Sequence, residues 1–260
     1  MADRMRVATF NLLYYPQGDR WRERRPLVEA QLRSLAPDVL GLQEVNRPNN
    51  QDHDLAASVK PELDYQVFRA SETVRPRYPR HWDAVVFLVA AGAGEVLGHE
   101  VHRLTYLRVV QALRLRRPSG RTVTCLNTHL IHGEDPKGYG ARRNQVRTML
   151  EWLDSLPKSD LVTIVGDFNA VPDEPAVDMM RSAGFHSAHQ TANGVDPVTY
   201  PSGLLASWTY GHPDLCIDYI WVRGSGHVLD ARLAFDGPSL EDPGLYPSDH
   251  RGLVADLELS

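Results

Sequence analysis

The chain of 260 residues has little cysteine and little lysine. Its only cysteines, Cys125 and Cys216, lie in apolar runs and form neither a disulfide framework nor a Cys-x-x-Cys zinc pattern, so we expect two buried free thiols. Its only lysines are Lys60, Lys137 and Lys158, and arginine supplies the rest of the basic charge. Arginine matches phosphate well, but most of these side chains are expected to be solvated surface.

Long hydrophobic runs are also missing. No uncharged segment approaches the roughly 18 residues that a membrane-spanning helix needs, and the first residues contain no apolar signal core. We therefore expect a cytoplasmic protein without a transmembrane segment. The net charge of -5 argues against strong non-specific binding of polyanions, which usually requires a basic excess. A nucleic-acid substrate is not excluded, because local arginines or a bound metal can offset the mean charge.

Short strand-like runs outnumber helical patterns, which favours a mixed α/β protein with more than one sheet over strict βαβ alternation. No break in composition marks a linker, so residues 1–260 are expected to form a single domain. The strand-like runs are Val7–Phe10, Val39–Leu42, Ala84–Val89, Val109–Leu115, Thr122–Leu126, Leu161–Val165, Ile217–Val222, Val228–Ala234 and Leu253–Leu257. Helical spacing is found at Arg22–Leu35, Arg142–Leu156 and, more weakly, Glu174–Ala183. Loops are expected at Asn46–Asp54, Glu72–His81, Gly133–Ala141 and Phe235–Pro247.

The segment from Leu161 to Asn169 is the most informative in the chain. An apolar run ends there in Gly166 and Asp167, and Asn169 follows two positions later. If the strand geometry persists, Asp167 and Asn169 share a face, because side chains alternate along a strand. A carboxylate can accept a proton or hold a cation, and an amide donates hydrogen bonds without adding negative charge, which suits an anionic substrate. The same residues are also ordinary turn-formers, so this motif alone does not distinguish a functional site from a turn.

Polar residues stand at five further strand ends. They are Asn11, Glu44, the segment Asn127-Thr-His129, Asp218 and the segment Ser248-Asp249-His250. Each has a structural alternative: Asn11 could cap a turn, Glu44 could be the first exposed residue after a strand, and His129 could be a satisfied semi-buried histidine. Asp218 is harder to explain in this way, because a charge at the head of an apolar strand needs a partner. The same placement at six strand ends favours one shared site.

These residue types suit metal-assisted phosphoryl transfer. Mg²⁺ typically uses one or two carboxylates together with water and substrate oxygens, and Mn²⁺ is an acceptable substitute. Glu44 is the best candidate ligand, with Asn11 or Asp249 near it. No His-x-x-x-His or cysteine-rich pattern indicates zinc. The other polar groups fit an in-line attack by water, which needs a base, donors to the phosphate oxygens and a group that stabilises the leaving oxygen.

These motifs resemble those of the endonuclease/exonuclease/phosphatase superfamily, which includes DNase I-like nucleases, abasic-site endonucleases, neutral sphingomyelinases and inositol polyphosphate 5-phosphatases. The match spans nearly the whole chain, and its most specific part is Gly-Asp-Phe-Asn followed by Ser-Asp-His before a terminal strand. The resemblance implies a DNase I-like four-layer fold, a two-sheet α/β sandwich of mixed sheets with helices on the outer faces. The matching motifs are Thr9-Phe-Asn11, Leu42-Gln-Glu44, Asn127-Thr-His129, Gly166-Asp-Phe-Asn169, Ile217-Asp-Tyr and Ser248-Asp-His250.

The resemblance also implies roles for the acidic and amide side chains. Glu44 is similar to the principal metal ligand, Asn11 to a neighbour that binds metal water or phosphate, and Asp249 to a residue that helps to bind a second metal. Asp167 is similar to the residue that orients or deprotonates the attacking water. Asn169 resembles a donor to a phosphate oxygen.

Two histidines complete the implied machinery. His250 would contact the scissile phosphate, and Asp218 would fix its tautomer and stabilise its charged form. His129 resembles a second histidine that stabilises the transition state or protonates the leaving group. Whether Asp167 or His250 is the base stays open. The abasic-site endonucleases have a tyrosine where His129 falls, so the chain departs from that branch.

Candidates for substrate binding are fewer. Arg80 belongs to a basic, aromatic stretch that could grip a polyanion or form a solvated hairpin loop. His132 could shape a pocket for the leaving group, and Arg142 could reach phosphate or lie on a solvated helix face. The substrate is expected to be a small or lipid-derived phosphodiester or nucleic acid. A DNA or RNA nuclease and a catalytically silent binding module on the same fold are the alternatives, and no obligate protein partner can be inferred.

Overall fold

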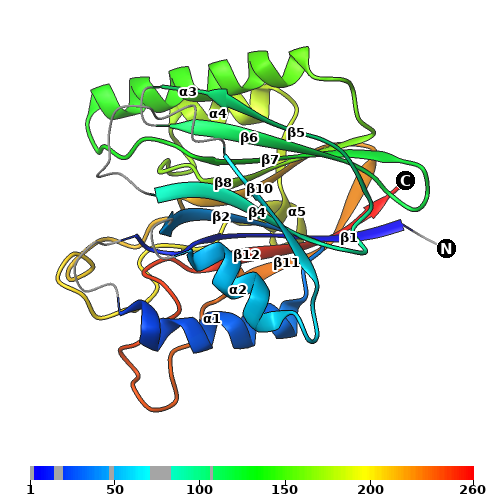
Figure 1. Cartoon of the computed structure of the whole chain (residues 1–260). Helices are drawn as coiled ribbons and strands as arrows, with labels where there is room; N and C mark the ends of the chain where they lie inside the picture. Colours follow the sequence, from blue (N-terminus) through cyan, green and yellow to red (C-terminus); the bar gives the residue numbers. More distant parts are fainter. Residues whose placement is uncertain (1–2, 15–19, 47–49, 71–82, 106–107) are drawn as a thin grey trace.

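Two six-stranded sheets are stacked face to face, with helices on the outside (Figure 1). The computed structural model of the chain describes residues 3–14, 20–46, 50–70, 83–105 and 108–260. The strand order is β11-β12-β1-β2-β4-β3 in the first sheet and β5-β6-β7-β8-β10-β9 in the second. The expected two-sheet α/β sandwich is therefore confirmed.

The elements have the following bounds. The strands of the first sheet are β1 (Asp3–Asn11), β2 (Val39–Asn46), β3 (Tyr65–Arg69), β4 (Asp83–Ala90), β11 (Gly226–Ala234) and β12 (Gly252–Leu259). Those of the second are β5 (Glu95–Arg103), β6 (Val109–Arg116), β7 (Thr122–His129), β8 (Leu161–Asp167), β9 (His186–Ser187) and β10 (Asp218–Gly224). The helices are α1 (Trp21–Leu35), α2 (Gln51–Val59), α3 (Pro136–Ser155), α4 (Pro175–Ser182) and α5 (Ala188–Asn193).

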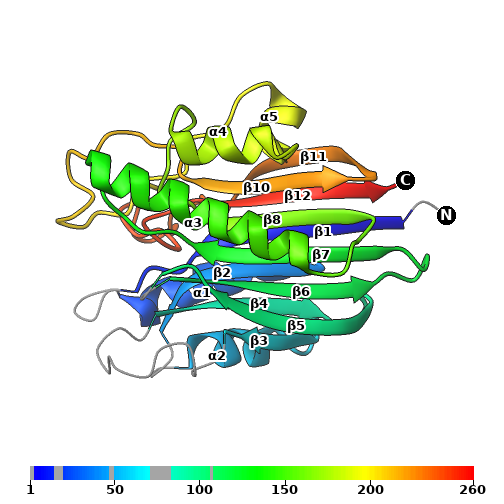
Figure 2. The ribbon, with the colours of Figure 1, turned by 90° about the horizontal axis from the view of Figure 1, so that it is seen from above.

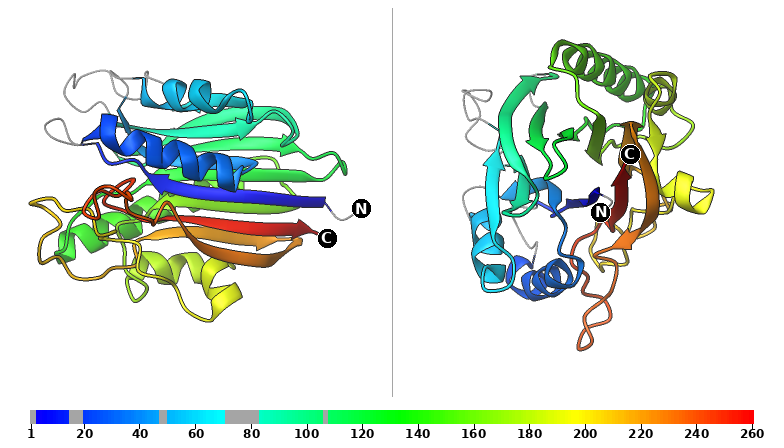
Figure 3. Two further views of the ribbon diagram at one scale, coloured as in Figure 1. Left: turned by 90° about the horizontal axis from the view of Figure 1, so that it is seen from below. Right: turned by 90° about the vertical axis from the view of Figure 1, so that its right-hand side faces the viewer.

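The alternation of side chains along the strands divides the core into three layers. Val7 of β1 points between the sheets and packs in the same cluster as Val165 of β8. The next residue, Ala8, points outwards and packs with Leu32 of α1. Helices α1 and α2 cover the outer face of the first sheet (Figure 3), and α3 and α4 cover that of the second (Figure 2). Because both of their faces are buried, the central strands carry short, mostly apolar runs such as Val39–Leu42 of β2 and Leu161–Val165 of β8, which the sequence shows.

Cys125 and Cys216 are both buried free thiols, as expected. The predicted strand-like runs also fall on strands, and the segment Phe235–Pro247 is a loop as predicted. None of the helices in the described part of the chain combines the length and the apolar character that crossing a membrane requires.

Two of the predicted loops contain helix starts. The prediction for Gly133–Ala141 is wrong from Pro136 onwards, because the Asp135 side chain accepts a hydrogen bond from the backbone N–H of Gly138 at 2.7 Å and caps α3 there. Proline at the first helical position fits this start, since its missing N–H would have no partner in the helix anyway. The prediction for Asn46–Asp54 is also wrong at its end, because the short polar helix α2 begins at Gln51. The predicted loop Glu72–His81 lies outside the described residues.

Strands β3 and β5 were not predicted. Both lie at a sheet edge, and β5 is only half-buried along most of its length, with charged residues such as Glu95 and Arg103. Edge strands of this kind often carry charges and lack the apolar signal of a central strand. Helix α5 and strand β9 are too short to leave a periodic pattern.

The pairing of the strands brings the polar strand ends together. Strand β1 runs parallel to β2, and β7 runs parallel to β8, so their ends meet at one edge of the sandwich. Asn11, His129 and Asp167 are the last residues of their strands, and Glu44 lies just before the end of β2. Strands β10 and β12 run antiparallel to their neighbours and therefore begin at the same edge of the sandwich. This places Asp218 and the segment 248–250 beside the other four ends.

Candidate active site

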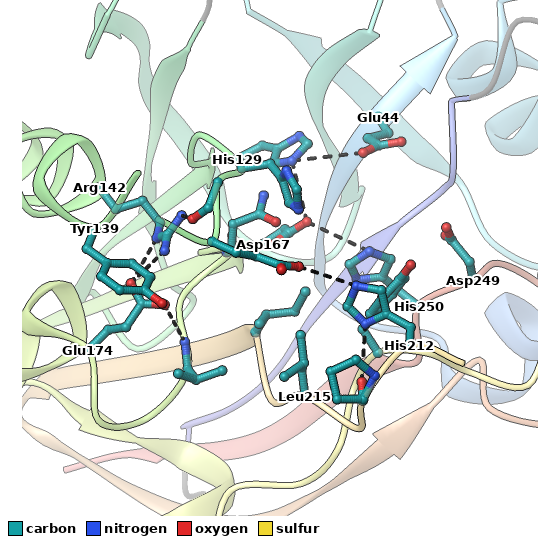
Figure 4. Close-up of a pocket in the computed structure, with 18 of the residues that line it drawn as sticks. Glu44, His129, Tyr139, Arg142, Asp167, Glu174, His212, Leu215, Asp249 and His250 are labelled. Carbon is teal, nitrogen blue, oxygen red and sulfur yellow. Dashed lines mark hydrogen bonds and ion pairs between the residues drawn. The ribbon is translucent and has the colours of Figure 1, made fainter. Parts of the chain in front are cut away.

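Asp167 lies at the centre of the site (Figure 4). Its Oδ2 atom accepts a hydrogen bond from Asn11 Nδ2 at 3.1 Å. The same oxygen lies 3.4 Å from His129 Nε2 and 3.9 Å from His250 Nε2. The Oδ1 atom accepts a hydrogen bond from the backbone N–H of Asn169 at 2.8 Å. One carboxylate therefore joins residues from β1, β7, the turn after β8 and the segment before β12.

Backbone geometry explains why glycine precedes Asp167. Gly166 has a φ of +142°, and a Cβ atom placed there would lie 2.0 Å from the backbone oxygen of Thr128 on β7. Only glycine permits so close an approach in this conformation. Strand geometry ends at Asp167, so Asn169 does not share its face by alternation. Asn169 instead turns back with a φ of 49°, and its Nδ2 donates to the backbone oxygen of Leu130 at 3.1 Å.

Glu44 is presented by an irregularity in β2. The pairing of β2 with β4 shifts register between Leu42 and Val45, and Glu44 has a φ of 54°, which L-residues adopt rarely. Its Oε2 accepts a hydrogen bond from the backbone N–H of Tyr14 at 2.8 Å, and its Oε1 lies 3.9 Å from His129 Nε2. The side chain is 24% exposed and faces the pocket. Strained conformations of this kind often occur at functional sites.

The two site histidines have different partners. His250 Nδ1 lies 2.9 Å from Asp218 Oδ2, and both side chains are buried. Burial alone would lower the pKa of His250, but the charge and hydrogen bond of Asp218 raise it well above its usual value. His129 Nδ1 instead lies 2.7 Å from a guanidinium nitrogen of Arg108. Burial and the nearby charge of Asp218 raise the pKa of Asp167 to about 7.

A pocket of about 470 Å³ opens beside these groups. Glu44, His129, His132, Arg142, Asp167, Asn169, Asp249 and His250 all line it. Asn11 and Asp218 stand behind this wall and reach it through Asp167 and His250. Every candidate residue inside the described part of the chain therefore belongs to one cluster. Arg80 lies outside the described residues.

Arg142 is a buried part of the pocket wall, so a solvated helix face is the wrong description. Its side chain is 1% exposed, and its Nε and Nη2 atoms donate to Glu174 Oε2 at 3.0 and 2.7 Å. Its Nη1 donates to the backbone oxygens of Ile131 and Gly133 at 3.1 and 2.7 Å. The guanidinium thereby ties α3 to the segment that follows His129, while His132 lies exposed at the rim.

Asp249 is fixed by its own set of donors. Its Oδ2 accepts a hydrogen bond from Trp208 Nε1 at 2.9 Å, and its Oδ1 accepts one from Ser248 Oγ at 3.2 Å. A tryptophan N–H donates a hydrogen bond without adding a charge of its own.

Arg108, Tyr200 and His212 line the pocket but were not predicted from the sequence. The Tyr200 ring lies 4.9 Å from that of His250 and packs edge-on against His212 at 4.8 Å. Burial, followed by the charge of Asp249, raises the pKa of Tyr200 to about 12, so its hydroxyl stays protonated. None of the three belongs to a strand-end motif: Arg108 directly precedes β6, and Tyr200 and His212 lie outside the named strands, between α5 and β10.

The donor set fits a hard divalent cation. Oxygen ligands are available from Glu44 and Asp249 at the pocket wall and from Asn11 beside them, and none of the described lining residues supplies sulfur. Ligand atoms of Asp167, Asp218 and His250 also lie within 4.8 Å of one another. In that group, however, His250 Nδ1 and Asp218 Oδ2 are already hydrogen-bonded to each other, so these two atoms are not free to bind a metal. Glu44, which is partly exposed and lines the pocket, is the candidate ligand that a cation could reach from the pocket.

The chain is similar to known proteins over nearly its whole length. A model of the Endonuclease/Exonuclease/phosphatase family matches residues 8–250. Nocturnin from Homo sapiens is 26% identical over an alignment of 275 residues that covers 93% of this chain. The chain spans 59% of the length of that relative.

Three solved structures share the fold. An endonuclease/exonuclease/phosphatase from Bacteroides vulgatus has a TM-score of 0.80 at 22% identity, covering 99% of both chains. The human Nocturnin catalytic domain with bound sulfate anion has a TM-score of 0.73 at 23% identity, covering 100% of this chain and 96% of that one. D. rerio TDP2 complexed with single strand DNA product has a TM-score of 0.77 at 18% identity, covering 98% of each. With the family model matching most of its length, the chain belongs to the Endonuclease/Exonuclease/phosphatase family.

Proposed function

We propose that this protein is a divalent-metal-dependent phosphodiesterase that hydrolyses its substrate by in-line attack of water. The observation that carries the proposal is the convergence of His129 Nε2 and His250 Nε2 on Asp167 Oδ2, at 3.4 and 3.9 Å, in the wall of a pocket. A carboxylate flanked by two imidazoles can accept a proton from water and supply donors to phosphate oxygens within one small volume.

Asp167 is best placed to act on the attacking water. Its oxygen is central to the cluster, and its raised pKa suits a base that works near neutral pH. The water oxygen forms a bond to phosphorus and gives one proton to Asp167, and the bond to the leaving oxygen breaks. The leaving oxygen takes up one proton from solvent, and Asp167 releases its proton to solvent. A phosphodiester and water thus give a phosphomonoester and an alcohol.

His250 and Asn169 would bind the phosphate. The Asp218 carboxylate holds the proton on His250 Nδ1 and stabilises the imidazolium, so Nε2–H can donate to a phosphate oxygen. Asn169 commits one Nδ2 hydrogen to Leu130, which orients the amide and leaves the second hydrogen for a substrate oxygen. Both donors lie beside Asp167 and can therefore align the phosphate with the attacking water.

Glu44, with Asn11 and Asp249, would hold the divalent cation, for which Mg²⁺ is proposed and Mn²⁺ is a suitable substitute. When bound, such a cation offsets the negative charge of the phosphoryl group and polarises its oxygens. The candidate ligands Glu44 and Asp249 lie in the pocket wall, where a bound cation would add positive charge to help bind an anionic substrate.

The proposed substrate is a small or lipid-derived phosphodiester. A pocket of about 470 Å³ holds a compact group, and the net charge of -5 does not favour long duplex DNA. The second candidate is a DNA or RNA nuclease. It is favoured by the similarity of fold to D. rerio TDP2, whose structure holds a single strand DNA product.

A direct test uses the purified full chain with Mg²⁺ and a chromogenic diaryl phosphodiester. Activity that EDTA removes and Mg²⁺ restores is expected, and Asp167→Asn and His250→Gln should each lower kcat at least about 100-fold. Asp178→Asn, a change of the same kind on the exposed face of α4, should leave kcat unchanged. If the protein with Mg²⁺ hydrolyses neither phosphodiesters nor phosphomonoesters, the proposal is overturned and a binding module is favoured.

The same preparation then separates the candidate substrates. Sphingomyelin, inositol phosphates, nucleotides, single-stranded DNA, RNA and plasmid DNA are compared at equal phosphodiester concentration by kcat/KM. A preference for a small or lipid-derived diester supports the first candidate. A preference for single-stranded DNA or RNA supports the nuclease.

A further inference from the structure

Arg108 stands directly behind His129. It is the residue before β6, which pairs with β7 so that Val110 lies opposite Thr128. The Thr128 hydroxyl donates to the backbone oxygen of Val109 at 3.1 Å, which fixes the start of β6 against the end of β7. From this anchored position a guanidinium nitrogen of Arg108 comes within 2.7 Å of His129 Nδ1. The contact is therefore built into the pairing of the two strands.

The chemistry of this contact determines where the His129 proton lies. Arginine has only N–H donors and no acceptor, and it keeps its charge in proteins. His129 Nδ1 must therefore accept the hydrogen bond with its lone pair, which leaves the ring proton on Nε2. That nitrogen lies 3.4 Å from Asp167 Oδ2, which can accept its hydrogen. The contacts of Nδ1 and of Nε2 therefore both favour the Nε2–H tautomer of His129.

His250 has the opposite arrangement. Its Nδ1 faces the Asp218 carboxylate at 2.9 Å, and a carboxylate accepts, so the proton lies on Nδ1. The two Nε2 atoms approach the same Asp167 oxygen, but the Nδ1 atoms have partners of opposite charge. Nδ1 of His129 contacts the Arg108 guanidinium, and Nδ1 of His250 contacts the Asp218 carboxylate. Asp218 supports a full positive charge on its histidine, whereas Arg108 supports a neutral donor.

Resting on the proposed phosphodiesterase function, we propose that Arg108 is a positioning residue that fixes His129 as an Nε2–H donor to a non-bridging phosphate oxygen. His129 then stabilises the charge on the phosphoryl group and does not protonate the leaving group. Donation of a proton to the leaving oxygen would require Nε2 to lose its hydrogen while Nδ1 is still occupied by the guanidinium hydrogen. The hydrogen bond from Arg108 disfavours that state, since Nδ1 could not take up a replacement proton.

The two roles of His129 predict different responses to the leaving group. A donor to a non-bridging oxygen helps all substrates to the same extent. A proton donor to the leaving oxygen matters most for poor leaving groups and little for good ones. Arg108→Met removes the hydrogen bond to Nδ1 while keeping most of the side-chain volume, and Arg108→Lys keeps one cationic donor.

The kinetic test measures kcat and KM of the full chain with Mg²⁺ for a series of aryl phosphodiesters that differ only in the pKa of the leaving phenol. Arg108→Met is expected to lower kcat about 10–100-fold by the same factor across the series, with a smaller change in KM. Arg108→Lys should restore part of the loss. Arg116→Met, at the exposed far end of β6, is the matched control and should leave kcat unchanged.

Three outcomes would overturn the inference. A loss that grows steeply as the leaving group becomes poorer would make His129 the general acid. A change in KM alone would make Arg108 a substrate contact, and unchanged kinetics would give it no role at the site.

A second measurement does not require activity. The ¹⁵N shifts of the His129 ring, read from a long-range ¹H–¹⁵N correlation spectrum, should report an unprotonated Nδ1 and a protonated Nε2 in the parent protein. The spectrum of Arg108→Met should lose this single-tautomer signature, while the His250 signals keep theirs. An Nδ1–H tautomer of His129 in the parent protein would disprove the inference even if the protein is a phosphodiesterase. The expected spectrum without any hydrolysis would instead count against the proposed function alone.

Discussion

Asp218 is the directly opposed partner of Asp167 in the antiparallel pairing of β10 with β8. Two buried carboxylates therefore face each other at the last position of one strand and the first position of the next. After burial, the charge of Asp218 is the largest contribution that raises the pKa of Asp167, and the same carboxylate raises the pKa of His250. A single strand pair thus sets the protonation of both the proposed base and the proposed phosphate donor.

Replacing Asp218 with asparagine should shift the pH profile of the reaction as well as its rate. Without the negative charge, the pKa of Asp167 falls below about 7 and that of His250 falls towards its ordinary value. Because the active form needs Asp167 deprotonated and His250 protonated, both limbs of the profile should move to lower pH. We expect kcat at pH 7 to fall about 100-fold or more, measured with the chromogenic phosphodiester.

The matched control for this shift is Asp178→Asn, which removes an exposed carboxylate from α4. Its profile should superimpose on that of the parent protein. If Asp218→Asn lowered the rate but left both limbs in place, the carboxylate would be orienting the imidazole without setting its protonation.

Gly166→Ala should destabilise the fold at the site itself. The new Cβ would meet the Thr128 oxygen at 2.0 Å, and the φ of +142° is unfavourable for alanine, so we expect a loss of about 2–4 kcal/mol in the free energy of unfolding. Urea denaturation followed by fluorescence measures this loss. Gly98→Ala, on strand β5 with nothing within 4 Å of the new Cβ, should change stability little. Equal losses of unfolding free energy for the two changes would show that the close approach of β8 to β7 does not require glycine at position 166.

Arg142→Met tests whether this arginine is structural. Its removal leaves Glu174 as a buried carboxylate without its cation, and breaking a buried pair in this way costs about 3–5 kcal/mol. Arg147→Met removes an exposed pair with Glu151 on the same helix and should cost no more than about 0.5 kcal/mol. Thermal unfolding of both variants measures the difference. A stable Arg142→Met protein with a raised KM would instead make Arg142 a direct contact of the substrate.

A site residue can be predicted from the sequence when its position is determined by its neighbours along the chain. The strand ends at Asn11, Glu44 and Asp167 could be recognised because apolar runs buried on both faces stop abruptly at a polar residue. Their convergence follows from strand pairing, which the sequence does not state but which the parallel pairs β1–β2 and β7–β8 produce. The motifs along the chain therefore predict which residues form the site, and strand pairing explains why they meet.

Residues that depend on tertiary contacts could not be predicted in this way. Arg108 directly precedes β6 and becomes a partner of His129 only when β6 pairs with β7. Arg142 lies on an ordinary amphipathic helix pattern, and only the fold shows that its charge is buried against Glu174. The edge strand β5 is only half-buried along most of its length and shows no apolar alternation, because an edge strand gains its hydrogen bonds without burying a full face.

Glu44→Gln should weaken metal binding. The amide keeps the shape of the side chain but removes the charge that a hard cation prefers. We expect the Mg²⁺ concentration for half-maximal activity to rise at least about 10-fold, since even outer partners of metal ligands have effects of this size. Calorimetric titration with Mn²⁺ should show the same loss without substrate. Glu95→Gln, an exposed glutamate paired with Arg116, is the control, and a Glu44→Gln protein with unchanged metal affinity would move the principal ligand elsewhere.

The pair of Arg6 and Asp256 should make stability depend on pH far from the site. These residues stand opposite each other on β1 and β12, with Arg6 Nε 2.6 Å from Asp256 Oδ1, and the hydrogen bond from Arg6 lowers the pKa of Asp256. A lowered pKa in the folded state stabilises the protein above the unfolded pKa of about 3.9, and this contribution is lost as the pH falls through the lowered value. Asp256→Asn should therefore cost about 0.5–1 kcal/mol at pH 7, as expected for a partly exposed pair. The difference between the two proteins in urea denaturation should shrink steadily below about pH 4. A difference that stays constant from pH 7 to pH 3 would mean that the loss comes from packing, because packing does not respond to the protonation of Asp256.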